Sequence, residues 1–462
     1  MSRLVVVSNR VADLSIPAQS GGLAVGLGDA LRQSGGLWFG WDGNVVEAGT
    51  KVAPTIVEVD AVTTVTLPMT KKDYDEYYVG FSNRVLWPVF HYRLDLAEYE
   101  PNFVDGYKRV NSKFADALSP LLEPNDFIWI HDYHLIPLAL ELRLRGHCQK
   151  IGFFLHIPFP PFDVLSAAPE HEWLVESMFS YDLVGFQSHT DLANFERYVQ
   201  EQMQGALRPD GAISALGRDI IAGSFPIGID VDGFRAMAFS EEADEQIDLL
   251  RRRTTARIHI IGVDRLDYSK GLPDRLCAFR RLLERYPENH KNVTLMQIAP
   301  PTREEVHAYA DIRQELEMLS GAINGEFADF DWTPVRYIHR VIPRHILAAL
   351  FRGSQVGFVT PLRDGMNLVA KEFVAAQDDD DPGVLVLSKF AGAAEQLHEA
   401  LIVNPYDVDE MAEALERAIN MPLDERVERQ KALLARISRD DAEHWRTEFL
   451  LALTQGRIGL AA

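Results

Sequence analysis

One predicted strand–turn–helix segment constrains the fold of this chain more than any other. The run Val356–Thr360 is continuously apolar, which predicts a buried strand, and Pro361 and Gly365 interrupt it before a helix-forming run, Asn367–Gln377. Asn367 is suited to cap that helix, and the unpaired backbone N–H groups of its first turn can bind an anion such as a diphosphate. Strand-to-helix turns are common in α/β domains, so an ordinary connection remains the alternative at this point.

Two carboxylates flank the same turn. Asp364 precedes the predicted helix, and Glu372 follows eight residues later, about two helical turns from the helix start. Both can therefore contact one ligand without touching each other. One carboxylate would suit sugar hydroxyls and the other a ribose.

Length and charge bound the class of protein. The 462 residues are 47% hydrophobic and 25% charged, which predicts a soluble globular protein with two domains of about 200 residues each. The net charge is −22, from 68 acidic and 46 basic residues, so neither nucleic acid nor an anionic membrane is expected as a partner. An anionic substrate would need a local cationic pocket.

Cysteine spacing and hydropathy point to a compartment. Cys148 and Cys277 lie far apart and show no metal-ligand spacing, so neither a disulfide nor a zinc site is expected. The apolar run Leu4–Val7 is too short for a signal peptide, and no apolar stretch reaches membrane-spanning length. We expect a cytoplasmic protein.

Apolar runs alternate with helix-forming runs along the whole chain, which predicts an α/β protein with two doubly wound, Rossmann-like domains. The segment Leu423–Leu453 is expected to be wholly helical. The predicted strands are Leu4–Val7, Phe127–Ile130, Ile151–Leu155, Leu183–Phe186, Ile220–Phe225, Ile258–Val263, Val293–Ile298, Val356–Thr360, Val384–Leu387 and Leu401–Val403.

Polar residues follow several strands of the first half. Arg10 follows the first strand, and Asp132 and His156 follow two successive strands. Open α/β sheets bind ligands at the carboxyl ends of their strands, so these residues indicate a site, although a structural histidine remains an alternative. Aromatic residues next to polar ones, Trp41, Tyr78 and Trp87 among them, suit sugar rings, and core packing is their alternative.

The strand ends of the second half carry basic residues. Arg265 and Lys270 lie in one loop after a strand, and Arg303 follows the next strand, as a phosphate pocket requires. A solvent-exposed loop is the alternative. No G-x-G-x-x-G follows a strand and no P-loop motif occurs, which argues against dinucleotide oxidoreductases and P-loop kinases. Asp-x-Asp triplets occur at Asp73, Asp230, Asp329 and Asp407, as expected by chance in an acidic chain, so no metal is expected.

Several motifs together resemble one family. They are Val5–Arg10, Asp75–Tyr78, Leu86–Pro88, His131–His134, Phe153–Pro160, Asp264–Gly271, Pro361–Glu372 and Val403–Tyr406. The sequence resembles the trehalose-6-phosphate synthases, retaining glucosyltransferases of the two-domain GT-B type in glycosyltransferase family 20. The resemblance implies two Rossmann-like domains facing across a cleft: residues 1–232 for the acceptor, 233–440 for the nucleotide sugar, and a C-terminal helix, 441–462, returning to the first domain.

The resemblance also implies an activity. It implies transfer of glucose from a nucleotide sugar, UDP-glucose being the expected donor, to glucose 6-phosphate, which gives α,α-trehalose 6-phosphate and a nucleoside diphosphate. The implied transfer is front-face and needs no metal or other cofactor. A pseudo-glycosyltransferase acting on a cyclitol phosphate and a catalytically silent sugar-phosphate sensor are the alternatives. The sequence leaves open the donor base, uridine, guanosine or adenosine, and whether the chain forms a dimer or tetramer.

Residue roles carry over by position. Those implied for the acceptor are Arg10, Trp41, Tyr78, Trp87, Asp132 and Arg303. Those implied for the donor are Gly21, Gly22, Arg265, Lys270, Ile342, Gly365, Met366, Asn367, Leu368, Val369, Ala370, Lys371 and Glu372, with Ile342 where the family places an aromatic residue beside the base. The implied catalytic residues are Asp364, His156, Arg265 and Lys270.

Overall fold

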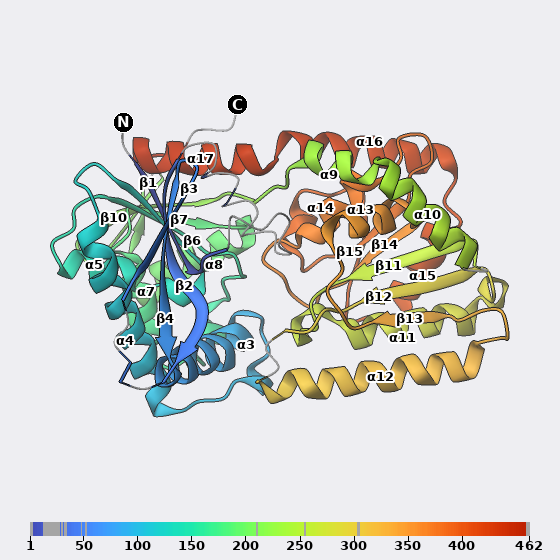
Figure 1. Cartoon of the computed structure of the whole chain (residues 1–462), viewed down its shortest axis with the longest axis horizontal. Helices are drawn as coiled ribbons and strands as arrows, with labels where there is room; N and C mark the ends of the chain where they lie inside the picture. Colours follow the sequence, from blue (N-terminus) through green and yellow to red (C-terminus); the bar gives the residue numbers. More distant parts are fainter. Residues whose placement is uncertain are drawn as a thin grey trace. The chain divides into compact units, whose positions relative to one another are not determined.

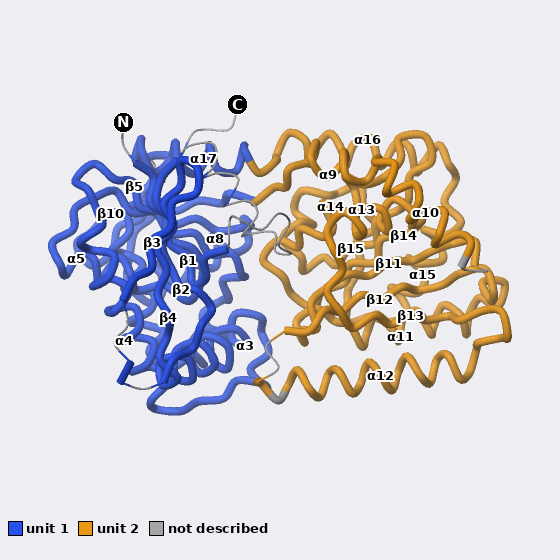
Figure 2. The backbone as a smooth tube through the Cα atoms, viewed as in Figure 1, with its two compact units in different colours: residues 1–226, 443–462 blue, residues 227–442 orange. Residues whose placement is uncertain are grey.

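The chain forms two compact units. The computed structural model describes residues 3–12, 28, 31, 35–47, 49–50, 53–208, 211–253, 256–302 and 305–458. Unit 1 comprises Met1–Pro226 with Glu443–Ala462, and unit 2 comprises Ile227–Ala442 (Figure 2). The boundaries thus follow residues 226 and 442, where the sequence analysis placed them after 232 and 440.

Unit 1 is built on a ten-stranded sheet of order β3-β4-β2-β1-β5-β6-β7-β10-β9-β8. The seven strands from β4 to β10 in that order pair in parallel, while β3, β9 and β8 pair antiparallel at the two edges. The strands are β1 (Leu4–Arg10), β2 (Gly36–Val46), β3 (Thr55–Val59), β4 (Val62–Thr70), β5 (Phe127–His131), β6 (Lys150–Phe154), β7 (Leu183–Phe186), β8 (Ala206–Leu207), β9 (Ala212–Ala215) and β10 (Arg218–Ser224).

The described helices of unit 1 include a long π-helical segment, Tyr74–Leu86, a conformation that is rare and often marks functional sites. The α-helices are α2 (Lys71–Asp73), α3 (Trp87–Phe90), α4 (Pro101–Leu118), α5 (Leu138–Leu144), α6 (Phe162–Leu165), α7 (His171–Met178), α8 (His189–Gln202) and α17 (Ala442–Gln455). Short 3₁₀ turns occupy Leu94–Leu96, Ser119–Leu121 and Tyr133–Leu135.

Unit 2 is built on a six-stranded parallel sheet of order β13-β12-β11-β14-β15-β16. Numbered within the unit, this order is 3-2-1-4-5-6, the Rossmann arrangement. The strands are β11 (Ile258–Val263), β12 (Val293–Ile298), β13 (Val335–Ile338), β14 (Val356–Val359), β15 (Val384–Ser388) and β16 (Leu401–Val403). The sequence-based expectation of two doubly wound, Rossmann-like units is confirmed.

Two groups of helices flank the sheet of unit 2 (Figure 1). One group contains α11 (Leu272–Arg285), α12 (His307–Phe327) and α15 (Val408–Ile419). The other contains α9 (Val231–Ala238), α10 (Glu241–Arg253), α13 (Arg344–Arg352), α14 (Leu368–Ala376) and α16 (Leu423–Arg439). Burial of strands on both faces explains why β14 and β15 read as continuous apolar runs, and why β11 and β12 are apolar at most positions.

Every strand predicted from the sequence is present, with ends shifted by no more than three residues. The strands β2, β3, β4, β8, β9 and β13 were missed, because they are short or because Gly, Pro, Thr and charged residues interrupt their apolar pattern, and burial alternates along β4. The segment predicted as wholly helical breaks at Asp440 and Asp441, between α16 and α17. Among the described residues, no helix is long and apolar enough to cross a membrane.

The last helix, α17, belongs to the core of unit 1. Phe449 is fully buried and stacks on Trp129 of β5 with ring centroids 4.7 Å apart. Its ring also covers Gly152 and Gly185, where an added Cβ would come within 2.8 Å and 2.7 Å of it. The lack of a side chain at Gly152 of β6 and at Gly185 of β7 therefore leaves the space that the ring of Phe449 occupies.

We predict that Phe449→Ala lowers the stability of unit 1 by about 3–5 kcal/mol, because it removes a buried ring over two glycines that cannot fill the cavity. Urea unfolding followed by tryptophan fluorescence measures the change. Leu451→Ala is the matched control, since Leu451 on the same helix is 44% exposed. Equal shifts for the two variants would contradict the packing of α17 described here.

Candidate active site

The strand order of unit 2 brings two predicted loops together. The strands β11 and β14 are central neighbours, and the chain leaves them toward opposite edges of the sheet. In such sheets ligands bind outside the carboxyl ends of the strands at this switch point. The loop Asp264–Gly271 follows β11, and the turn at 360–367 follows β14, so the cationic loop and the carboxylate turn meet there.

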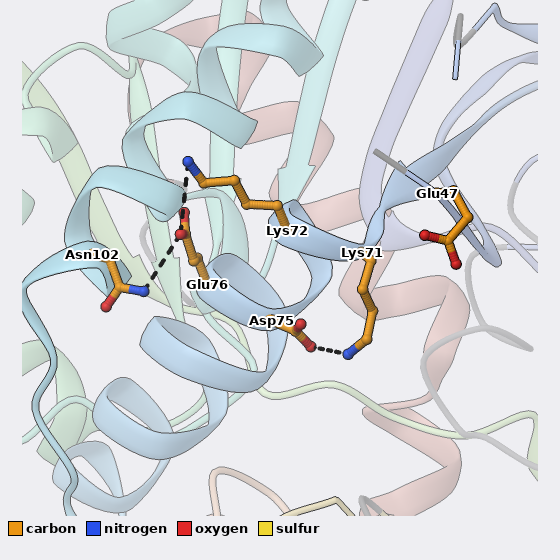
Figure 3. A pocket seen from close by; sticks show the side chains of 6 residues that line it. All are labelled: Glu47, Lys71, Lys72, Asp75, Glu76 and Asn102. Carbon is orange, nitrogen blue, oxygen red and sulfur yellow. Dashed lines mark hydrogen bonds and ion pairs between the residues drawn. The ribbon is translucent and has the colours of Figure 1, made fainter. Parts of the chain in front are cut away.

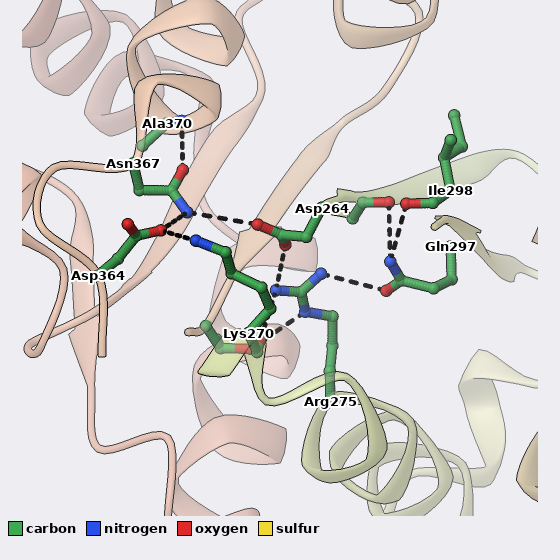
Figure 4. Close-up of polar contacts among 10 residues, drawn as sticks. Asp264, Lys270, Arg275, Gln297, Ile298, Asp364, Asn367 and Ala370 are labelled. Carbon is green, nitrogen blue, oxygen red and sulfur yellow. Dashed lines mark hydrogen bonds and ion pairs between the residues drawn. The ribbon is translucent and has the colours of Figure 1, made fainter. Parts of the chain in front are cut away.

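Lys270 and Asp364 form an ion pair at this point. The Nζ of Lys270 lies 2.5 Å from Oδ2 of Asp364, and the two side chains are only 9% and 14% exposed (Figure 4). The Nδ2 of Asn367 donates to the same Asp364 oxygen at 3.1 Å and lies 3.4 Å from Oδ1 of Asp264. A cation, a carboxylate and an amide are thus held within reach of one ligand.

Arg275 of α11 holds the loop Asp264–Gly271 in place through buried hydrogen bonds. Its guanidinium is fully buried and donates to Oδ2 of Asp264 at 2.8 Å, Oε1 of Gln297 at 3.1 Å and Oγ1 of Thr360 at 3.1 Å. These partners end β11, β12 and β14, so one side chain links three neighbouring strands. Burial raises the pKa of the Asp264 carboxyl, and the charge of Arg275 opposes that rise.

The turn itself is fixed by the residues after β15. The N–H of Asp364 donates to the carbonyl of Phe390 at 3.1 Å, and the N–H of Gly392 donates to the carbonyl of Asp364 at 3.1 Å. A Cβ on Gly392 would lie 1.9 Å from the carbonyl oxygen of Gly365, so only glycine allows this contact. Asn367 adopts a left-handed conformation, φ 73°, and its side chain accepts from the N–H of Ala370, which confirms it as the N-cap of α14.

Glu372 lies on α14, as predicted, but about one and a half turns after the N-cap Asn367 rather than two. Its carboxylate is 3.4 Å from Nη2 of Arg344, at the start of α13, and the two side chains are 16% and 19% exposed. Burial raises the pKa of Glu372, and the attraction of Arg344 opposes the rise. Ile342, two residues before α13, is buried. Leu368 and Val369 are half-buried, and Gly365, Met366 and Ala370 are buried.

Lys371 directs its ammonium away from the turn. The Nζ lies 2.7 Å from the carbonyl of Ile227 and 2.7 Å from Oε1 of Gln396. Burial lowers the pKa of Lys371 to about 7. Only its backbone therefore belongs to the start of α14. Arg265 is exposed on the loop that carries Lys270. Gly21, Gly22 and Arg303 lie outside the residues that the structure describes.

Unit 1 repeats the arrangement at its own switch point, between β1 and β5. Arg10 ends β1, and Asp132 follows β5. Asp132 adopts a φ of 76°, uncommon for a residue with a Cβ, and its Oδ1 accepts from the N–H of Tyr133 at 3.0 Å and of His156 at 3.3 Å. Its carboxylate thus joins the ends of β5 and β6, where two of the predicted residues meet.

His156 has a partner at each ring nitrogen. Its Nε2 lies 3.1 Å from Nδ1 of His131, and its Nδ1 lies 3.2 Å from the side-chain amide of Gln187. Burial lowers the pKa of His156 to about 3. Burial holds the pKa of His131 well below its ordinary value, and the nearby His156 imidazole is a second cause, because two adjacent rings cannot both take up a proton. Both histidines are neutral at physiological pH.

Aromatic side chains gather beside Arg10. The guanidinium of Arg10 lies 5.9 Å from the ring centroid of Trp41, and Trp41 lies 5.4 Å from Tyr78. Tyr78 in turn stacks on His134 at 5.9 Å. Trp87 packs on Tyr133, next to Asp132, with centroids 5.7 Å apart. Within unit 1, the structure therefore groups the five described residues that the resemblance implied for the acceptor around neighbouring strand ends.

A separate pocket in unit 1 contains none of the predicted residues. Its charged side chains pair with each other: Lys71 with Asp75, Lys72 with Glu76 at 3.9 Å, and Asn102 with Glu76 at 3.4 Å (Figure 3). Glu47 also lines it.

The Asp-x-Asp triplets have structural roles. Asp73 pairs with Arg109 at 2.9 Å and with Lys113 at 2.5 Å, and Asp230 and Asp407 cap the starts of α9 and α15. Asp329 pairs with Lys291. In the described part of the chain, no group of three or more His, Cys, Asp or Glu side chains is placed to hold a metal ion.

Sequence reasoning missed Arg275, Arg344 and Gln187. Arg275 could have been found, because it falls on the apolar stripe of its helix between Leu272, Leu276 and Phe279, where a charge needs a buried partner. Gln187 carries no such signal, because it begins the polar run after β7, and Arg344 carries none, because a basic residue in the first turn of a helix indicates no particular partner.

Two Rossmann-like units with charged side chains at both switch points are features of the GT-B class of enzymes, to which the solved relatives below belong. A sequence model of Glycosyltransferase family 20 matches residues 4–455. The trehalose-6-phosphate synthase of Cronobacter sakazakii is 49% identical over 457 residues, covering 98% of this chain and 96% of that protein. The chain belongs to glycosyltransferase family 20.

Solved structures of relatives superimpose over nearly the whole chain. A UDP-forming α,α-trehalose-phosphate synthase from Burkholderia xenovorans, in complex with glucose-6-phosphate, is 51% identical with a TM-score of 0.95, covering 98% of this chain and 100% of that one. An E. coli relative bound with UDP-2-fluoro glucose is 47% identical with a TM-score of 0.93, covering 98% and 99%.

We predict that acidification destabilises unit 1 through His131. The unfolded chain takes up a proton near pH 6.5 that buried His131 does not, so the free energy of unfolding falls as the pH drops. Between pH 7.5 and 5.5 this group accounts for about 1.4 kcal/mol. Urea unfolding of His131→Gln at both pH values should show that much less pH dependence than the wild type. An unchanged dependence would contradict the neutral, buried state of His131.

Proposed function

We propose that this chain transfers glucose from a nucleotide sugar, UDP-glucose foremost, to glucose 6-phosphate with retention of configuration. The products are α,α-trehalose 6-phosphate and a nucleoside diphosphate. The observation that carries the proposal is the pair Lys270 and Asp364, side by side at the switch point of unit 2 and before the N-terminus of α14. Membership of family 20 and the relatives bound to glucose-6-phosphate and UDP-2-fluoro glucose support the same substrates.

Unit 2 would bind the donor. Lys270 and Arg265 would neutralise the diphosphate together with the N–H groups at the start of α14. Asp364 would accept hydrogen bonds from glucose hydroxyls, and Glu372, oriented by Arg344, would accept from the ribose. Ile342 would lie beside the base. The family resemblance assigns Gly21 and Gly22 to the donor as well.

Unit 1 would bind the acceptor. Arg10 would bind the phosphate, with Arg303 joining it by the family resemblance, while Asp132 would accept from sugar hydroxyls. Trp41, Tyr78 and Trp87 offer the aromatic and polar surface that a sugar ring requires. His156, neutral and held at both nitrogens, would act as a fixed wall of the site rather than as an acid or base.

The family resemblance implies a front-face transfer step. The bond between the anomeric carbon and the donor phosphate oxygen breaks, and the acceptor hydroxyl oxygen bonds to that carbon on the same face. The proton of the acceptor hydroxyl passes to the leaving phosphate oxygen. Lys270 and Arg265 would stabilise the charge that grows on the phosphate, so positioning and electrostatics supply the catalysis and no metal is required.

The direct test offers UDP-, GDP- and ADP-glucose, each with glucose 6-phosphate or with glucose, and identifies the product by NMR. The proposal expects α,α-trehalose 6-phosphate from glucose 6-phosphate and little product from glucose. Product formed only with a cyclitol phosphate acceptor would favour a pseudo-glycosyltransferase. Binding of sugar phosphate without any product would favour a sensor.

We predict that Arg265→Ala and Lys270→Ala each lower kcat about 100-fold or more and weaken nucleotide-sugar affinity only about tenfold. The charge they stabilise develops mainly in the transition state. Steady-state kinetics and calorimetry measure both quantities, and the double variant should fall short of additive because both cations serve one diphosphate. Near-wild-type turnover in either variant would contradict the assignment of that residue to the diphosphate.

We predict that a chelator leaves the rate unchanged, because cationic side chains take the place that a divalent ion would fill at the diphosphate. The measurement is initial rate with and without EDTA after dialysis. Loss of activity that Mg²⁺ or Mn²⁺ restores would show that the diphosphate needs a metal.

A further inference from the structure

The Lys270–Asp364 pair joins two groups that the proposed function gives separate tasks. Lys270 is assigned to the diphosphate and Asp364 to the glucose, yet the two side chains bind each other at 2.5 Å in a largely buried setting. An ammonium has three N–H donors, but a contact this short holds it against the carboxylate, so a donor competes with that contact for both side chains. The inference developed here rests on the proposed function.

Only side chains need to move in this exchange. The backbone around Lys270 is fixed, because the N–H of Leu362 donates to the carbonyl of Ser269 at 2.8 Å and Arg275 lies 3.5 Å from the carbonyl of Lys270. Gly271, with a φ of 63°, packs its backbone against Thr360. The flexible stem of Lys270 can therefore swing its ammonium to a phosphate while the loop stays in place.

Asp364 keeps one partner when Lys270 leaves. Its Oδ2 still accepts from Nδ2 of Asn367, and its backbone is bound to Phe390 and Gly392. The carboxylate then has room for a sugar hydroxyl at the position that the ammonium vacated. Without that hydroxyl, a carboxylate 14% exposed would lose its cation and gain nothing.

We propose that the carboxylate of Asp364 competes with the diphosphate of a bound nucleotide for the ammonium of Lys270. The intact donor separates the pair and gives each member a new partner, the diphosphate for Lys270 and a glucose hydroxyl for Asp364. Once the disaccharide has left, the nucleoside diphosphate offers Asp364 no partner, so Asp364 competes with the diphosphate for Lys270 and weakens the binding of that product. Asp364 thereby discriminates the nucleotide sugar from its own product.

The test compares Asp364→Asn with the wild type by calorimetry, using UDP and UDP-glucose without acceptor. We expect UDP to bind about tenfold more tightly to the variant, because Lys270 no longer has a competing anion. UDP-glucose should gain no affinity, because its hydroxyl loses the carboxylate. Asp364→Ser should also tighten UDP binding, which keeps the test valid should the asparagine variant fold poorly.

The same substitution in a variant without Lys270 distinguishes competition for the lysine from simple repulsion between Asp364 and the phosphate. In Lys270→Met, the change Asp364→Asn should improve UDP affinity less than about twofold, because no lysine remains to be released. An equal or larger gain in that background would show simple repulsion and overturn the proposal.

The control for total charge is Asp409→Asn. Asp409 pairs with Arg281 and Arg285 at the far end of α11 from Lys270 and is 60% exposed. It should leave UDP affinity unchanged. If the wild type binds UDP and Asp364→Asn binds it no more tightly, the competition between Asp364 and the diphosphate is refuted but the proposed function is not. If the wild type binds no UDP, both the proposed function and the competition are refuted.

Discussion

The buried ion pair between Arg275 and Asp264 is the interaction on which the site in unit 2 depends. A guanidinium without solvent contact is tolerated only when its donors are satisfied, and here they are bound to Asp264, Gln297 and Thr360. Because these partners end three neighbouring strands, the requirement to satisfy one buried charge fixes the loop with Lys270 against the turn with Asp364. The backbone of both residues is therefore held in place, so that only their side chains need to move when they exchange partners.

Both units place their polar residues by the same topological rule. In unit 2 the switch point lies between β11 and β14, and in unit 1 between β1 and β5. Each has an acidic residue in an uncommon local setting: Asp132 at a φ of 76°, and Asp364 before a left-handed Asn367. Such backbone conformations are costly, and they occur at functional sites where the surroundings enforce them.

The sequence predicted the strands, the switch-point residues and the cap of α14 because these follow from local pattern: continuous apolar runs, turn residues and polar strand ends. It did not predict β2 and β4, because their own residues lack a regular apolar pattern and they form strands by pairing with their neighbours in the sheet. Nor did it predict that Lys371 turns toward Ile227, or which residues pair with Arg275, because a side chain's partner depends on segments distant in the chain. Pairing between charged residues that are distant in the chain does not follow from local sequence patterns.

The decisive measurement is a crystal structure of this protein with UDP-glucose bound. A diphosphate oxygen should lie within hydrogen-bond distance of the Nζ of Lys270 and near the first N–H groups of α14. A glucose hydroxyl should lie on the carboxylate of Asp364. A diphosphate bound away from Lys270, or a Lys270–Asp364 pair left intact beside the bound donor, would contradict this assignment of the donor site.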